Sequence, residues 1–229
     1  MKIDVPYGKD SRMSAVISDD INVSFLEAND VKIGNEDKNI KEAIKNPINA
    51  KSFKEFLSDA KKVLVIVNDA TRPTPTKKIL EFIFDDLKQT NFNFIIATGA
   101  HRGPSQEEYL QIFGSFYEEI KDQIIVHDAR VEDDMVFLGQ STNGTQMYVN
   151  KAGVEADKII IISSVEPHYF AGYTGGRKSF LPGIAGYKTI EQNHKLALAP
   201  EAKALALDGN PVHEDMIDAI KTVKQEIFS

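Results

Sequence analysis

Four short apolar runs recur along the middle of the chain. They are rich in β-branched residues and cover residues 63–67, 92–97, 124–126 and 158–164. Continuous apolar runs of this length are typical of strands covered by helices on both faces. The pattern therefore predicts an α/β fold of the doubly wound, Rossmann-like type, with a mostly parallel sheet and helices on both faces.

Helical periodicity appears between the predicted strands. A crossover helix is expected after the first run, because helical spacing separates Ile79, Leu80, Phe82, Ile83 and Leu87. A second helix is expected from about Ser105 to Phe113. It opens with a possible capping box, since Glu108 follows Ser105 by three residues.

The two ends of the chain are less regular. Near the start we expect a strand or hairpin at about 15–25, a turn at Gly34-Asn35 and a helix at about 52–61. A last helix is predicted to begin at Asn210-Pro211 and to run to the end, with no strand after it. Such an ending suggests a fragment or a single lobe.

Composition narrows the chemistry. The 229 residues include no cysteine, which excludes disulfides, thiolate nucleophiles, iron–sulfur clusters and thiolate zinc sites. The net charge of -7 disfavours nucleic acid as a partner, since phosphate backbones are bound by clustered Lys and Arg. A small anion remains a suitable ligand.

The sequence also indicates where the protein resides. No apolar run approaches the roughly 20 residues that a membrane span needs. The N-terminal segment MKIDVPYGKD lacks the apolar stretch of a secretory signal. We therefore expect a cytoplasmic protein without a membrane partner.

Polar and charged residues follow each predicted strand. The four segments read, in order, NDATRPTP, TGAHRG, HDAR and SVEPHYFAGYTGGRKS. In open α/β sheets, ligands bind beyond the carboxyl ends of the strands. The segments therefore predict a site at that edge of the sheet.

Each of these residues also has a purely structural interpretation. Asp69 and Arg72 could form a helix-entry cap and a surface ion pair, and His101 and His168 could be loop imidazoles bonded to backbone. A structural turn is favoured for His127 and Asp128, and His213, three residues into a capped helix, is expected to be a surface or interface residue.

The segment GYTGGRKS, residues 172–179, resembles a phosphate-binding loop of the form G-x-x-x-x-G-K-[ST]. Arg177 stands where the last glycine of that loop should be. The segment also begins too far after the predicted strand, so an ATP-binding loop is disfavoured. A Gly-Gly pair beside Arg177 and Lys178 can still hold a phosphate. Lys178 is in addition a candidate nucleophile.

Together the segments resemble the nickel-pincer-dependent lactate racemases and related 2-hydroxyacid racemases and epimerases. The resemblance rests on NDATRPTP, TGAHRG, GNPVH and above all EPHYFAGYTGGRKSFLPGIAGYKTIEQNHKL. It covers essentially the whole chain and implies an isomerase. It also implies that residues 1–229 are the N-terminal, cofactor-bearing lobe, and that the family's C-terminal lobe, with its own substrate and cofactor contacts, is absent.

The resemblance implies a cofactor and its protein contacts. The cofactor would be nickel held by pyridinium-3-thioamide-5-thiocarboxylic acid mononucleotide, with Lys178 as its covalent attachment and His194 as the protein ligand to nickel. The remaining cofactor-binding residues would be Thr174, Gly175, Gly176 and Arg177. Cofactor-biosynthesis proteins are the implied partners.

The resemblance also assigns the acid/base groups. His101 and His168 would exchange the hydroxyl proton of a small 2-hydroxyacid such as lactate, because an imidazole takes and returns protons near neutral pH. Arg72 would bind the substrate carboxylate, and Asp69 would orient a neighbouring imidazole or the arginine.

Two other functions stay open from the sequence. One is a metal-dependent hydrolase with His101, His168 and His194 as direct ligands. The other is a non-catalytic lobe that binds a phosphate or nucleotide, or serves as a partner-binding subunit.

Overall fold

The structure is a computed structural model that describes residues 1–229 except Lys9, Ala28 and Ile33. It divides into two compact units, Met1–Glu36 and Asp37–Ser229. The first unit holds an antiparallel hairpin of strands β1 (Lys2–Tyr7) and β2 (Ser11–Val16). The sequence analysis placed this hairpin too late, at about 15–25, because its residues are exposed except for the half-buried Ile3 and give no buried apolar run.

The second unit is built on a five-stranded parallel sheet. Its strands, in spatial order, are β11 (Glu226–Phe228), β8 (Lys158–Ile162), β3 (Val63–Asn68), β4 (Phe92–Ala97) and β5 (Ile124–Val126). Every neighbouring pair is parallel. The α/β prediction and the four predicted strands are thus confirmed.

The end of the chain corrects one expectation. Helix α8 (Pro211–Ile220) stops before the terminus, and β11 then pairs with β8 along Glu226–Phe228. The prediction of a helix to the end with no closing strand was wrong. Three residues are too few to give a periodic signal, and the strand is held by packing of Phe228 against Phe53 and Phe56, with ring centroids 5.3 and 5.5 Å apart.

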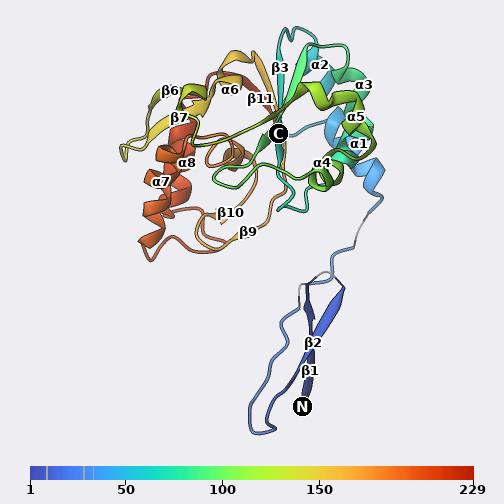
Figure 1. Ribbon diagram of the computed structural model, residues 1–229, viewed down its shortest axis with the longest axis vertical. Helices are drawn as coiled ribbons and strands as arrows, with labels where there is room; N and C mark the ends of the chain where they lie inside the picture. Colours follow the sequence, from blue (N-terminus) through green and yellow to red (C-terminus); the bar gives the residue numbers. More distant parts are fainter. Residues whose placement is uncertain (9, 28, 33) are drawn as a thin grey trace. The chain divides into compact units, whose positions relative to one another are not determined.

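The helices of the second unit lie on both faces of the sheet (Figure 1). They are α1 (Glu36–Lys45), α2 (Phe53–Leu57), α3 (Thr76–Leu87), α4 (Gln106–Phe113), α5 (Tyr117–Ile120), α6 (Lys151–Glu155), α7 (Tyr187–Lys195) and α8. The expected crossover helix and the Ser105–Glu108 capping box of α4 are confirmed. Helix α1 was not predicted, and α2 is shorter than expected. Within the described residues, no helix has the length and hydropathy needed to cross a membrane.

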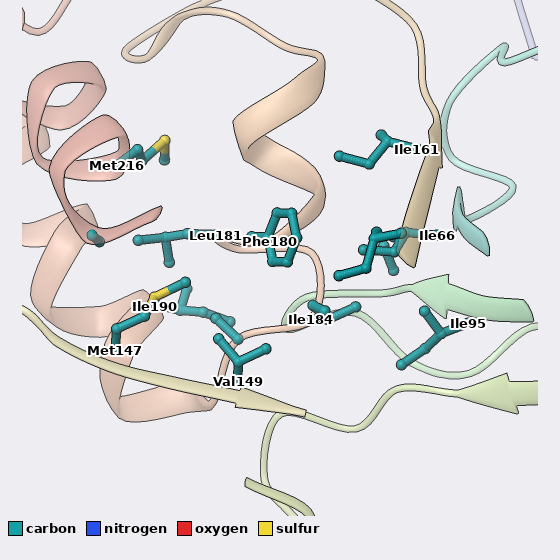
Figure 2. Close-up of a cluster of buried hydrophobic side chains, with 14 of the residues drawn as sticks. Ile66, Ile95, Met147, Val149, Ile161, Phe180, Leu181, Ile184, Ile190 and Met216 are labelled. Atoms are coloured by element: carbon teal, nitrogen blue, oxygen red, sulfur yellow. The ribbon is translucent and has the colours of Figure 1, made fainter. Parts of the chain in front are cut away.

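Alternate residues of each strand enter two separate hydrophobic clusters. On β3, Leu64 and Ile66 join one cluster, whereas Val63, Val65 and Val67 join the other with helices α3 and α4. Figure 2 shows the first cluster, with Ile66, Ile95, Ile161, Met147, Val149, Phe180, Leu181, Ile184, Ile190 and Met216 labelled. Two filled faces are what a doubly wound sheet requires.

A second antiparallel hairpin, which the sequence analysis missed, supports this first cluster. Strand β6 (Met135–Gln140) pairs with β7 (Gln146–Asn150). Both strands come after β5 and before β8 in the chain. Met147 and Val149 of β7 are fully buried. The hairpin packs against α7, so it helps to fix the helix that carries His194.

Candidate active site

A cavity of about 430 Å³ opens at the carboxyl ends of β3, β4 and β8. The segments after these strands supply most of its lining, as the topology predicts. The predicted site residues among its lining are Asp69, Arg72, His101, His168, Thr174, Gly175, Lys178 and His194. Gly176 and Arg177 are not part of that lining.

Asp69 and His101 form a hydrogen-bonded pair at the edge of the cavity. The carboxylate Oδ2 lies 2.7 Å from the imidazole Nδ1, and Oδ1 accepts hydrogen bonds from the backbone and hydroxyl of Thr71. Asp69 is buried, whereas the His101 side chain is 56% exposed. Because a carboxylate can only accept, the pair places the ring hydrogen on Nδ1 and leaves the Nε2 lone pair available.

Arg72 follows β3 and precedes α3. Its Nη1 lies 3.7 Å from Oε2 of Glu166, which is beyond hydrogen-bond distance. The ion pair with Asp69 that a structural interpretation suggested is not formed, since Asp69 bonds to His101 and Thr71 instead. The guanidinium therefore keeps donors for an anionic ligand in the cavity.

His168 lies on a small hairpin of β9 (Pro167–His168) and β10 (Gly172–Tyr173). The backbone N–H groups of Ala171 and Phe170 donate to its Nδ1 at 3.2 and 3.5 Å. A neutral imidazole that accepts at Nδ1 carries its hydrogen on Nε2. That Nε2 lies 3.3 Å from Nζ of Lys178.

Lys178 comes from a short 3₁₀ helix, Gly176–Ser179, and is half-buried. Burial lowers the pKa of its ammonium group to about 7, and the neighbouring guanidinium groups of Arg177 and Arg72 add to this shift. No ion pair found among the described residues includes Lys178. The amine is therefore far less basic than an ordinary lysine.

The same burial acts on the histidines. Burial, followed by the charge of Lys178, lowers the pKa of His168 to about 4, and the same two causes lower the pKa of His194 to about 4. Both rings are therefore neutral at pH 7, as a metal ligand or a proton acceptor must be.

His194 lies near the end of α7, with its ring packed edge-on against Phe170 at 5.0 Å. Its Nδ1 is buried and has no hydrogen-bond partner among the described residues. The backbone of Ile190, one turn earlier, raises the pKa of the ring, but burial and the charge of Lys178 outweigh this effect. A neutral imidazole in a cavity is a suitable donor to a divalent metal.

The loop before Lys178 is fixed by its own bonds. Thr174 Oγ1 donates to the Ser164 carbonyl at 2.8 Å and accepts from the Glu166 N–H at 2.8 Å. Gly175 has φ +84°, and a Cβ there would lie 2.7 Å from Cγ2 of Val165. Only glycine fits this conformation and this space.

Arg177 has a different environment from the one expected. Its Nη2 donates to the carbonyl oxygens of Ala171 and Tyr173 at 2.8 and 2.9 Å, so it braces the turn between β9 and β10. Its contact with a cofactor phosphate stays a prediction, and the same holds for Gly176.

Two further histidines lie outside the cavity. His127 is buried, with Nε2 3.0 Å from the Ala185 carbonyl and Nδ1 3.3 Å from the Asn150 amide, in keeping with the favoured structural role. His213 is half-buried in the first turn of α8, and its prediction as a surface or interface residue stays a prediction.

Asn210, of the GNPVH segment, supports the site from outside the cavity, whereas the sequence analysis placed it only at the start of the last helix. Its Oδ1 accepts from the backbone of Val212 and His213 to cap α8. Its Nδ2 donates to the Phe170 carbonyl at 2.9 Å, next to the His168 hairpin. An Asn-Pro pair signals the cap, but nothing in the sequence signals the second bond.

The described residues contain no group of three or more His, Asp or Glu side chains arranged to hold a metal ion. The hydrolase interpretation needs His101, His168 and His194 on one metal together with an activated water. The side-chain geometry therefore does not support it.

Comparison with known proteins identifies the family. A profile described as lactate racemase N-terminal domain matches residues 7–205. The chain belongs to the lactate racemase family. The resemblance seen in the motifs is thereby confirmed over most of the sequence.

Individual relatives agree with this membership. The chain is 36% identical over 228 residues to a lactate racemase from Thermoanaerobacterium thermosaccharolyticum, and 33% identical over 233 residues to one from Lactiplantibacillus plantarum. These alignments cover 96% and 97% of the chain but 53% and 54% of the relatives. The chain thus spans about half the length of the curated family members it matches.

Solved structures support the fold. The lactate racemase apoprotein from T. thermosaccharolyticum matches with a TM-score of 0.86 and 35% identity, over 98% of this chain and 54% of that one. A Thermotoga maritima protein matches with a TM-score of 0.67 over 83% of this chain and 49% of that one; at 22% identity it supports the fold alone.

Proposed function

We propose that this chain is the cofactor-bearing lobe of a 2-hydroxyacid racemase or epimerase of the lactate racemase type. The observation that carries the proposal is the convergence, in one cavity, of a lysine with lowered basicity, two neutral histidines, an Asp–His pair and an arginine. The substrate class is inferred from the relatives, which are lactate racemases, and lactate is the first candidate.

The residues present fit the nickel-pincer nucleotide. Lys178 would attach it covalently, His194 would ligate nickel, and Thr174 and Gly175 would contact it in the lining. Because the described residues offer no three-ligand metal site, an organic ligand with its own sulfur and carbon donors suits this cavity. When bound, the cofactor would accept hydride from the substrate C2 carbon and return it.

His101 and His168 would handle the hydroxyl proton. His101 starts with a free Nε2 lone pair, because Asp69 holds its hydrogen on Nδ1, and can take the proton directly. His168 starts with its hydrogen on Nε2. It can accept a proton at Nε2 only after its hydrogen has moved to Nδ1. This change of tautomer breaks the hydrogen bonds that the backbone N–H groups of Phe170 and Ala171 donate to Nδ1.

Arg72 would hold the substrate carboxylate while the oxidised intermediate rotates in the cavity. A guanidinium fork binds a carboxylate through two parallel hydrogen bonds, so the acid end stays fixed when the C2 carbon presents its other face. Cofactor-biosynthesis proteins and the second half of the family's sequence would be the partners of this lobe.

The test is racemisation in D₂O by protein that carries the cofactor. We expect D-lactate to form from L-lactate with the original hydrogen kept at C2, because a hydride does not exchange with solvent. Deuterium at C2 would indicate proton abstraction and contradict the proposal. His101→Gln and His168→Gln should each lower the rate roughly a hundredfold or more, the usual loss on removing an acid/base group.

A further inference from the structure

The contact between His168 and Lys178 defines the state of the lysine. Two backbone N–H groups point at Nδ1 of His168, so its hydrogen lies on Nε2. This Nε2–H faces Nζ of Lys178 at 3.3 Å. An ammonium group has no lone pair to accept this hydrogen, but a neutral amine does. The geometry itself therefore favours Lys178 as a free amine.

The surroundings maintain this state. Burial disfavours the ammonium form of Lys178, and the positive charges of Arg177 and Arg72 add to this effect. The nearby Glu166 carboxylate interacts with Arg72 rather than with the lysine. Neutral lysines in such cavities are nucleophiles toward carbonyl carbon.

Arg72, His168 and Lys178 line the same cavity. A 2-oxo acid presents a carboxylate next to a ketone, so one end suits the guanidinium and the other suits the amine. We propose that Lys178, when it carries no cofactor, condenses reversibly with 2-oxo acids such as pyruvate to form an imine in this cavity. The inference uses the carboxylate-binding role proposed above for Arg72, but it does not depend on the cofactor.

The reaction is balanced without an oxidant or reductant. The Nζ lone pair forms a bond to C2 of the 2-oxo acid, and the C=O π electrons move onto oxygen. The Nε2–H of His168 can shift its hydrogen bond from the amine to this oxygen. A proton passes from nitrogen to oxygen to give a carbinolamine, and loss of water leaves the C=N bond. Hydrolysis restores both partners, so a 2-oxo acid would compete with cofactor attachment at the same amine.

The experiment is reductive trapping on the chain purified without cofactor-biosynthesis proteins. Pyruvate and cyanoborohydride at neutral pH should convert Lys178 to its N-carboxyethyl derivative at least tenfold faster than any other lysine, as measured by peptide mass spectrometry. Lys178→Arg should remove the label. Equal labelling across surface lysines, or an unlabelled Lys178, would overturn the inference.

A matched pair of reagents tests the role of Arg72. Methyl pyruvate keeps the ketone but lacks the carboxylate. Arg72→Gln should lower the ratio of pyruvate labelling to methyl pyruvate labelling at Lys178 about tenfold, the effect of losing one charge-assisted interaction, because a change in the basicity of the amine affects both reagents alike. Labelling by methyl pyruvate that still prefers Lys178 over the surface lysines also shows that the variant is folded. Equal slowing with both reagents would contradict selection by the carboxylate.

Failure here is distinguishable from failure of the proposed function. A chain that forms no imine, but acquires an adduct on Lys178 during production with the biosynthesis proteins, would refute only the present inference. A chain that forms the imine but never acquires that adduct would refute the cofactor role instead.

Discussion

At the scale of single residues, the site depends on charges that repel one another. Burial lowers the pKa of His168 most, and the charge of Lys178 when its amine is protonated, with those of Arg72 and Arg177, lowers it further. Covalent attachment at Lys178 through a thioamide would prevent protonation of this amine. The basicity of His168 is therefore coupled to the chemical state of Lys178.

Lys178→Met tests this coupling. Removing the positive charge makes protonation of His168 easier, so its pKa should rise from about 4 toward the ordinary value of 6.5. The ring would then begin to titrate at a higher pH, which an NMR pH titration of the imidazole resolves. Lys195→Met, an exposed neighbour on α7, should leave the pKa unchanged. An unchanged His168 in Lys178→Met would contradict the coupling.

Most residues predicted for the site line the cavity, and the contact of Asp69 with an imidazole was among the predictions, but the other contacts were not. Lys178 and His194 were selected because they stand at the expected spacing in motifs that resemble those of the family. Asp69 pairs with His101, whereas Arg72 lies near Glu166, and these contacts depend on loop conformation. Arg177 shows the limit most clearly, since its bonds to Ala171 and Tyr173 arise from a turn that no pattern signals.

At the scale of elements, a buried carboxylate ties α7 to α8 and to the β6–β7 hairpin. Asp215 of α8 is 1% exposed. It accepts hydrogen bonds from the hydroxyls of Ser141 and Thr145 at 2.5 and 2.8 Å, and from Nδ2 of Asn193 at 2.8 Å. Asn193 precedes His194 in the chain, so this network helps to hold the proposed nickel ligand in place.

Asp215→Ala should therefore lower the free energy of unfolding by roughly 3 kcal/mol, because the buried hydroxyls of Ser141 and Thr145 lose their acceptor and Asn193 Nδ2 keeps only the Val212 carbonyl. Urea denaturation measures the change. Asp208→Ala, which removes an exposed carboxylate in the loop before α8, should change stability by less than about 0.5 kcal/mol. Equal effects of the two substitutions would show that the network does not stabilise the fold.

Elements were predictable where they are long and buried on both faces. The four apolar runs gave the sheet, and the capping box gave the start of α4. Strand β11 was missed because it is three residues long and pairs with β8, which is distant in sequence. The β1–β2 hairpin was misplaced because it is mostly exposed. The β6–β7 hairpin was missed although Met147 and Val149 are buried, since a register shift between Phe137 and Gly139 interrupts its period-two pattern.

At the scale of the whole molecule, the topology explains why the site is where it is. Strands β4, β3 and β8 lie side by side in a parallel sheet, so the segments that follow them meet at one edge, although β3 ends at Asn68 and β8 only at Ile162. All residues that line the cavity belong to the second unit. The family members it matches are about twice as long, and the proposed racemisation belongs to that longer protein.

The central claim is that this cavity is a covalent cofactor site at Lys178. The most direct measurement is peptide mass spectrometry with nickel analysis, on protein produced alongside the cofactor-biosynthesis proteins, both as this chain and extended to the length of its relatives. We predict an organic adduct on the peptide containing Lys178, with equimolar nickel that is lost in His194→Ala. An unmodified Lys178 in both forms, or nickel that His194→Ala retains, would contradict the account.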